Sequence, residues 1–143
     1  MPKMGLIVPR MEAVMLALVV DDSRAIRTIL CRILASLGLE TADADNGRSG
    51  LDTLNAMTVL PDVVFVDWNM PEVDGLEFIS AVRARPEWRD ISIIMVSSES
   101  EPGRIARALV AGAHEYVIKP FTPDAIDDKL RLLGLVAANA GTR

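Results

Sequence analysis

The sequence predicts an α/β protein with a doubly wound, five-stranded parallel sheet in the order 2-1-3-4-5 and helices on both faces. Short apolar runs alternate with amphipathic helical patterns along the whole chain, as in repeated strand–helix units. The strand candidates are apolar on both faces, which is typical of strands in a covered parallel sheet. Right-handed crossovers between such units favour that strand order, with strands one and three flanking the point where it reverses.

Length and composition agree with one covered sheet. The chain has 143 residues, of which 50% are hydrophobic, and this is enough for one domain with its own core. We place that domain at residues 15–136, after a flexible lead over 1–14 and before a frayed tail over 137–143. The net charge of −5 argues against a nucleic-acid partner. The single cysteine, Cys31, excludes an internal disulfide and fits a reducing cytoplasm.

The segment Ala13 to Val20 is apolar, and Lys3 and Arg10 precede it, so it faintly resembles a secretory signal peptide. It has no small-residue cleavage site before Asp21, and the run is far too short to span a membrane. We therefore predict a cytoplasmic protein with no membrane insertion.

The first strand candidate is Leu16 to Val20. Ser23 can cap the helix that follows, and Gly38 ends it. That helix has apolar residues at the spacing of one helical face, namely Ile26, Ile29, Leu30, Ile33, Leu34 and Leu37. The next strand, Leu39 to Ala44, is weaker and partly polar, so we expect it at the sheet edge.

The central elements follow the same alternation. Asn46-Gly47 marks a turn, and Arg48 to Met57 is a predicted helix. Val63 to Val66 is an apolar strand with three β-branched residues. A loop rich in turn residues, Asn69 to Gly75, leads into a third helix over Leu76 to Arg85.

The last two units complete the sheet. Ile91 to Val96 is the fourth strand, and Pro102 lies near the first position of a fourth helix that continues to Ala111. Tyr116 to Ile118 is the fifth strand, and Thr122 starts the fifth helix. The inner face of the fifth helix carries Ala125, Ile126, Leu130 and Leu133.

Polar side chains follow four of these strands where each strand ends. Asp21-Asp22 follow the first strand, Asp67 the third, Ser97-Ser98 the fourth and Lys119 the fifth. A carboxylate cannot stay unpaired in a core, so Asp67 must point out of the sheet. Because the carboxyl ends of parallel strands meet at one edge, we expect these groups to share one crevice.

Three carboxylates in one crevice repel one another, by roughly 4 kcal/mol per pair at about 4 Å and an effective dielectric of about 20. Protons or a divalent cation must offset this repulsion. Oxygen ligands without nearby histidine or cysteine favour Mg²⁺, or Mn²⁺, over Zn²⁺. Lys119 supplies an ammonium and Ser97 a hydroxyl for phosphoryl oxygens, with Ser98 as the weaker candidate. The set suits phosphoryl transfer onto a carboxylate.

The same residues resemble the receiver domain of two-component response regulators, and most of all its stand-alone, CheY-like members with the flavodoxin-like fold. The resemblance covers about residues 15–135 and rests on several motifs together. These are Asp21-Asp22, Asp67-Trp68-Asn69-Met70-Pro71, Asp74-Gly75, Ser97, Gly112-Ala113, Tyr116 and Lys119-Pro120-Phe121. Serine at position 97, where the family more often has threonine, is a mild departure that should preserve function.

The resemblance implies a role for each matching position. Asp67 would accept the phosphoryl group, while Lys119 and Ser97 would contact its oxygens. Asp22, Asp67 and the Asn69 backbone carbonyl would bind Mg²⁺, with Asp21 acting through water. Tyr116 would be an aromatic switch that turns inward as Ser97 moves towards the phosphate. Asn69 and Glu99 would tune the lifetime of the phosphate. The Lys119-Pro120 bond would be cis.

These roles predict a single-domain response regulator, a signalling switch rather than an enzyme. A histidine kinase or histidine phosphotransfer protein would phosphorylate Asp67. Because no output domain follows Leu135, a downstream effector protein would bind the face of the fourth helix, fifth strand and fifth helix. Tyr116 can also be a plain strand aromatic. Arg104 and Arg107 are expected on a solvated face, Trp68 at the crevice edge and His114 on the surface.

Three alternatives remain at this stage. A phosphorelay intermediate or phosphate sink would use the same chemistry without an effector surface. An aspartyl-nucleophile phosphatase of the haloacid-dehalogenase type would need an acid two residues after the nucleophile, where this chain has Asn69. A phosphorylation-independent docking module would have no need of like charges in one crevice.

Overall fold

Five parallel strands form the centre of the computed structural model, in the order β2-β1-β3-β4-β5. Their bounds are β1 Leu16–Val20, β2 Glu40–Ala44, β3 Val63–Val66, β4 Ser92–Ser97 and β5 Glu115–Ile118. The predicted strand order is confirmed, and β2 lies at the sheet edge as expected. The structure describes residues 14–136, so the predicted tail over 137–143 and all but the last residue of the lead over 1–14 lie outside the described residues.

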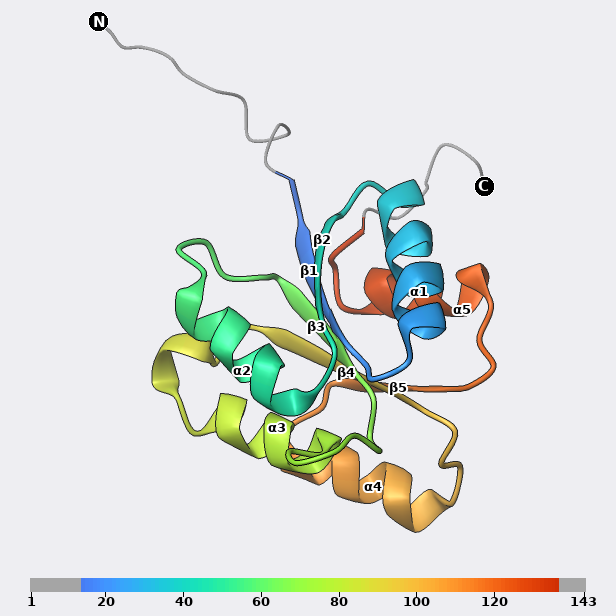
Figure 1. The fold of residues 1–143 in the computed structure, drawn as a ribbon. Coiled ribbons are helices and arrows are strands. Elements are labelled where there is room, and N and C mark those ends of the chain that lie inside the picture. The colour runs from blue at the N-terminus through green and yellow to red at the C-terminus, as the bar shows by residue number, and fades with distance from the viewer. Residues whose placement is uncertain (1–13, 137–143) are drawn as a thin grey trace, which may run out of the picture.

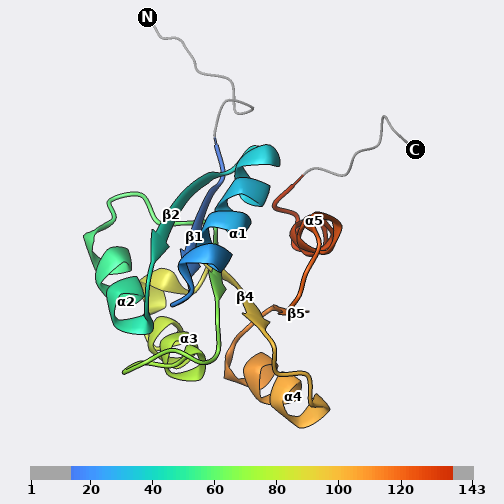
Figure 2. The ribbon, with the colours of Figure 1, turned by 45° about the vertical axis from the view of Figure 1, so that its right-hand side comes forward.

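Helices cover both faces of this sheet. Their bounds are α1 Arg24–Ser36, α2 Gly47–Ala56, α3 Gly75–Arg83, α4 Pro102–Ala111 and α5 Pro123–Leu132, with a short 3₁₀ helix, η3, at Pro86–Trp88. Figures 1 and 2 show α1 and α5 on one face of the sheet and α2, α3 and α4 on the other. Within the described residues, no helix is long and apolar enough to cross a membrane.

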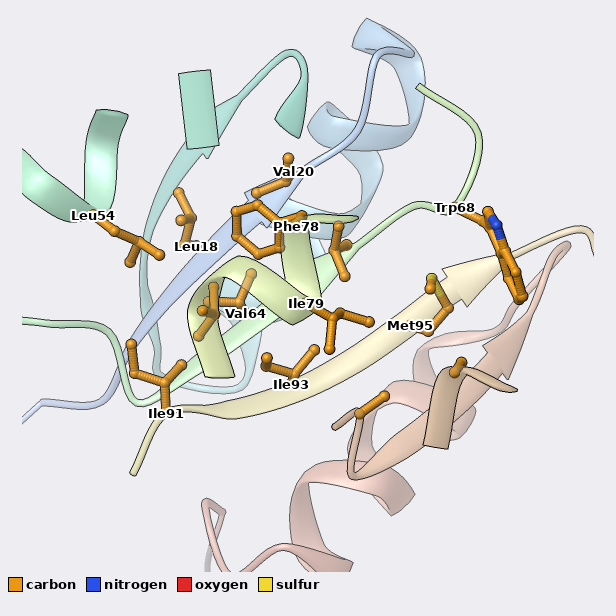
Figure 3. Close-up of a cluster of buried hydrophobic side chains, with 14 of the residues drawn as sticks. Leu18, Val20, Leu54, Val64, Trp68, Phe78, Ile79, Ile91, Ile93 and Met95 are labelled. Carbon is orange, nitrogen blue, oxygen red and sulfur yellow. The ribbon is translucent and has the colours of Figure 1, made fainter. Parts of the chain in front are cut away.

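The alternation of side chains along each strand divides the core into two layers. In β3, Val64 and Val66 face the layer under α2, α3 and α4, while Val63 and Phe65 face the layer under α1 and α5. All four residues of β3 are buried. Figure 3 shows the first layer, with Phe78 of α3 among the strand residues. A strand buried on both faces cannot slip in register without moving polar groups into the core.

Polar side chains cap the helix starts, and Ser23 does so as predicted. The Ser23 hydroxyl accepts a hydrogen bond from the Ile26 backbone N–H, 3.2 Å away. Asn46 and Asp74 each form a capping box, so α2 begins at Gly47 and α3 at Gly75, one residue earlier than predicted in both cases. The helix α3 ends at Arg83, two residues before the predicted end at Arg85, and the 3₁₀ helix η3, which was not predicted, begins at Pro86.

Candidate functional site

The register of the sheet brings the first two acidic positions together. Val20 pairs with Val66, so Asp21 and Asp67 leave adjacent strands at the same level. The backbone N–H of Asp67 donates to the Val20 carbonyl at 2.9 Å, which ties the two strand ends to each other. Both side chains are largely buried, with 3% of Asp21 and 8% of Asp67 exposed, whereas Asp22 is exposed.

Lys119 faces both buried carboxylates from the end of β5. Its Nζ donates to Asp21 Oδ2 at 2.9 Å and lies 3.4 Å from Asp67 Oδ2. The Lys119-Pro120 bond is cis, as the resemblance implied. The structure therefore places the predicted ammonium opposite the predicted acids, although the three residues come from different strands.

The remaining carboxylate oxygens of the two buried acids are held by backbone donors. Asp21 Oδ1 accepts from the Ser23 N–H at 2.8 Å, and Asp67 Oδ1 accepts from the Trp68 N–H at 2.7 Å. Burial raises the pKa of the Asp67 carboxyl, and the Asp21 charge raises it further, whereas Lys119 and the Trp68 N–H lower it. The balance leaves Asp67 with a pKa above the ordinary aspartate value, mainly because the carboxyl is buried.

The donor set fits a divalent cation. Ligand oxygens of Asp21, Asp22 and Asp67 all lie within 4.8 Å of one another. Three carboxylates without histidine or cysteine suit a hard cation such as Mg²⁺ or Mn²⁺. A cation at these oxygens would offset the repulsion between Asp21 and Asp67, which is one of the two effects that raise the pKa of Asp67. The Asn69 carbonyl as a further ligand stays a prediction.

Ser97, Glu99 and Tyr116 form one hydrogen-bonded group beside the acids. Ser97 is the last residue of β4 and is buried, and its hydroxyl accepts from the Glu99 N–H at 3.1 Å. Tyr116 is also buried, and its phenol donates to the Glu99 carbonyl at 2.7 Å. Tyr116 therefore points inward in this structure. Ser98, the weaker candidate, is exposed.

The two predicted tuning positions contact each other across the mouth of the crevice. Asn69 Nδ2 donates to Glu99 Oε2 at 3.4 Å, which is a long hydrogen bond. The other carboxylate oxygen of Glu99 lies 3.5 Å from Arg104 Nε of α4. Glu99 thus joins the loop after β3 to the start of α4.

Trp68 packs under the arginines of α4, a contact that the sequence analysis missed. Arg104 lies 5.2 Å and Arg107 6.0 Å from the centre of the Trp68 ring, within the reach of cation–π attraction. The ring itself is buried, and it lies beyond Met95 at the end of the core layer under α2, α3 and α4 (Figure 3). The only sequence signal was the spacing of Arg104 and Arg107, which puts both on one helical face.

His114 also has a structural contact that the sequence did not indicate. The residue is exposed as expected, yet its Nδ1 accepts from the Ile93 backbone N–H at 3.1 Å and lies 3.3 Å from Arg83 Nη2. Burial lowers the pKa of the His114 imidazole, and the Arg83 charge lowers it further. Folding therefore favours the neutral form of the His114 ring.

Comparison with known proteins gives the family to which the chain belongs. Residues 17–131 match the model of the response regulator receiver domain family. The chain belongs to that family, and it is a CheY-like receiver domain of two-component signalling.

Individual relatives match this chain over most of their length. The chemotaxis protein CheY1 of Helicobacter pylori is 38% identical over 117 residues, which cover 81% of this chain and 94% of that protein. A CheY homolog of Campylobacter jejuni is 40% identical over 115 residues, covering 79% and 87%. The solved structure of Vibrio cholerae CheY4 aligns with a TM-score of 0.78 and 32% identity, covering 84% of this chain and 98% of that one. These proteins are similar over nearly their whole length.

Proposed function

We propose that this receiver domain acts as a stand-alone switch, phosphorylated on Asp67 by a histidine kinase or a histidine phosphotransfer protein. The observation that supports it most is the cluster of three carboxylates, two of which pair with one ammonium: Lys119 Nζ lies 2.9 Å from Asp21 and 3.4 Å from Asp67. A pure scaffold gains nothing from like charges brought so close in a buried crevice.

Each residue has a defined part in the transfer. A carboxylate oxygen of Asp67 attacks phosphorus, the P–N bond of the donor phosphohistidine breaks, and its electron pair stays on the imidazole nitrogen, which takes up a proton. Lys119 holds the carboxylate in place and then faces the new phosphoryl oxygens, and the Ser97 hydroxyl donates to one of them. Asp21, Asp22 and Asp67 would hold Mg²⁺, which supplies charge neutralisation for the transferring group.

The switch would then act on the effector face. Ser97 drawn to the phosphoryl group would give up its hydrogen bond to the Glu99 N–H, the same residue whose carbonyl holds Tyr116. Exposed apolar side chains lie on α4 and β5, where Leu109 is 43% and Ile118 44% exposed. We propose that a downstream effector binds this α4-β5-α5 face, and that the protein works in the cytoplasm as a signalling protein rather than as an enzyme.

The test is phosphorylation with acetyl phosphate. We expect one added phosphoryl group by intact mass, dependent on Mg²⁺, and lost in Asp67→Asn and retained in Asp62→Asn. Asp62 is a suitable control because it lies at the opposite end of β3, where it caps the Leu16 N–H. Labelling that survives in Asp67→Asn would refute the assignment.

The same preparation separates the alternatives. Steady release of phosphate from an added phosphoester would favour the phosphatase, which Asn69 at the general-acid position already disfavours. Absence of both labelling and Mg²⁺ binding would favour the docking module. If Asp67 is labelled but amide NMR shows no change on the α4-β5-α5 face, a relay intermediate or phosphate sink would be favoured.

A further inference from the structure

A groove between α3 and α4 lies outside the acceptor site. Its volume is about 390 Å³, and six residues line it: Leu76, Ser80, Ala106, Arg107, Val110 and Ala111. Figures 1 and 2 both show α3 and α4 as neighbours at the side of the sheet away from α1 and α5. None of the lining residues belongs to the proposed phosphorylation chemistry, and none lies on β5 or α5.

The shape and polarity of this groove suit a helix. Ala106 and Val110 are one turn apart on α4, so they form a continuous apolar wall opposite Leu76. Val110 is 88% exposed, and the small side chains of Ser80 and Ala111 leave the floor open. A furrow between two helices accepts the apolar face of a third helix, whereas strand addition needs the sheet edges at β2 and β5.

The charge of the groove indicates what kind of helix it accepts. Arg107 is the one charged side chain among the lining residues, and no described carboxylate lies within ion-pair distance of it. Its contact is the Trp68 ring at 6.0 Å, the outer limit of cation–π attraction, while its neighbour Arg104 is paired with Glu99. An exposed guanidinium beside an apolar wall is complementary to a partner helix that carries a carboxylate next to an apolar side chain.

A second copy of this chain is the poorer occupant. A two-fold contact through the groove would place Arg107 close to its own copy. The aspartates of α5 could complement Arg107, but the apolar residues Ile126 and Leu130 of that helix are buried against the sheet, and Leu132 is its one exposed large apolar side chain. One exposed leucine does not make a continuous apolar helix face, so a helix of a different protein is the better occupant.

We propose that the α3–α4 groove is a docking site for an acidic amphipathic helix of a partner protein. The helix packs its apolar side chains against Val110 and Leu76 and sets a carboxylate on Arg107. The groove shares α4 with the α4-β5-α5 face but lies on the α3 side of that helix, and none of its lining residues is on β5 or α5.

The experiment uses two short helical peptides with the same leucine-rich face, one with glutamates flanking that face and one with lysines in their place. Binding to the unphosphorylated protein is followed by amide NMR, so the result does not depend on the proposed phosphorylation. We expect the glutamate peptide to shift the amides of α3 and α4 around the groove and to bind about tenfold more tightly than the lysine peptide.

Matched variants identify the contacts. Arg107→Glu should reverse the preference between the peptides, and Arg32→Glu, at an exposed position of α1, should leave it unchanged. Val110→Asp should weaken both peptides, while Val59→Asp, at a position that is also exposed, should not.

Three results would overturn the proposal. Shifts confined to β5 and α5 would place the peptide elsewhere. Equal affinity for both peptides would remove the role of Arg107. A dimer in sedimentation that Val110→Asp converts to monomer would show that a second copy occupies the groove.

Discussion

Replacement of Lys119 by methionine tests the electrostatics of the acceptor site. Methionine keeps most of the apolar stem and removes the ammonium that pairs with Asp21 at 2.9 Å and Asp67 at 3.4 Å. For the described part of the chain, no other ammonium or guanidinium forms an ion pair with either acid. The variant therefore leaves largely buried carboxylates facing one another without compensation.

The magnitude follows from the two distances and the burial. At an effective dielectric of about 20, each contact is worth roughly 5 kcal/mol before desolvation. Desolvation of the ammonium offsets much of this, and removing one partner of a buried pair typically costs about 3–5 kcal/mol. Because 18% of the Lys119 side chain is exposed, we expect the free energy of unfolding without metal to fall by about 3 kcal/mol, the lower end of that range.

Magnesium should shrink this loss, because the cation neutralises the same carboxylates. By linkage, whatever stability Mg²⁺ restores must appear as tighter Mg²⁺ binding by the variant, about tenfold for each 1.4 kcal/mol. The assay is urea unfolding followed by circular dichroism, in EDTA and in saturating Mg²⁺, together with a Mg²⁺ titration of each folded protein.

The matched control is Lys129→Met. Lys129 pairs with Glu115 at the same 2.9 Å, but both side chains are more exposed, at 30% and 27%. We expect a loss below about 1 kcal/mol that does not change with Mg²⁺. The reasoning is refuted if Lys119→Met loses equal stability in both media, or if it binds Mg²⁺ more weakly than the original chain.

Four further substitutions test other parts of the structure, and the last of them is a control. Burial raises the pKa of Asp67, so the folded protein loses stability as the pH rises through that raised pKa and the carboxyl ionises. Asp67→Asn should remove this loss. We therefore expect a higher urea midpoint for the metal-free variant at pH 7. Burial lowers the pKa of His114, whose Nδ1 accepts from Ile93, so unfolding free energy should fall as the pH drops from about 6.5 through the folded pKa. His114→Asn, which keeps an acceptor that does not titrate, should flatten that dependence in urea titrations at several pH values. Gly75→Ala would press a Cβ to 2.8 Å from the backbone just after the acceptor and should cost about 1–3 kcal/mol in a thermal melt. Gly103→Ala, where the Cβ meets nothing, should stabilise the chain by up to about 1 kcal/mol, and a loss there as large as at Gly75 would contradict this reasoning.

The fold and the centre of the site were predictable because both depend on the ends of buried strands. Val63 to Val66 can only be a strand covered on both faces, so the position of Asp67 at the exposed sheet edge follows directly. The same reasoning places Asp21 and Lys119 at that edge. Parallel strands bring their carboxyl ends together whatever the details of the helices, and this is why residues 98 positions apart could be predicted to meet.

The contacts of α4 were not predictable in this way. Periodicity shows which residues share a helical face, but not which loop that face covers. Arg104 and Arg107 looked like a solvated pair, and only the packing of α4 against the end of the core layer brings Trp68 beneath them. His114 escaped prediction for a similar reason, because its acceptor role depends on the Ile93 N–H of a different strand.

The inward position of Tyr116 has a consequence for how a switch of this kind would respond. Its phenol donates to the Glu99 carbonyl, and the Glu99 N–H donates to the Ser97 hydroxyl. Under the proposed function, one residue of the backbone therefore links the hydroxyl that meets the phosphoryl group to the aromatic ring. The dynamic range of such a device depends on how firmly one carbonyl holds one ring, and it is adjustable without touching the chemistry at the acid.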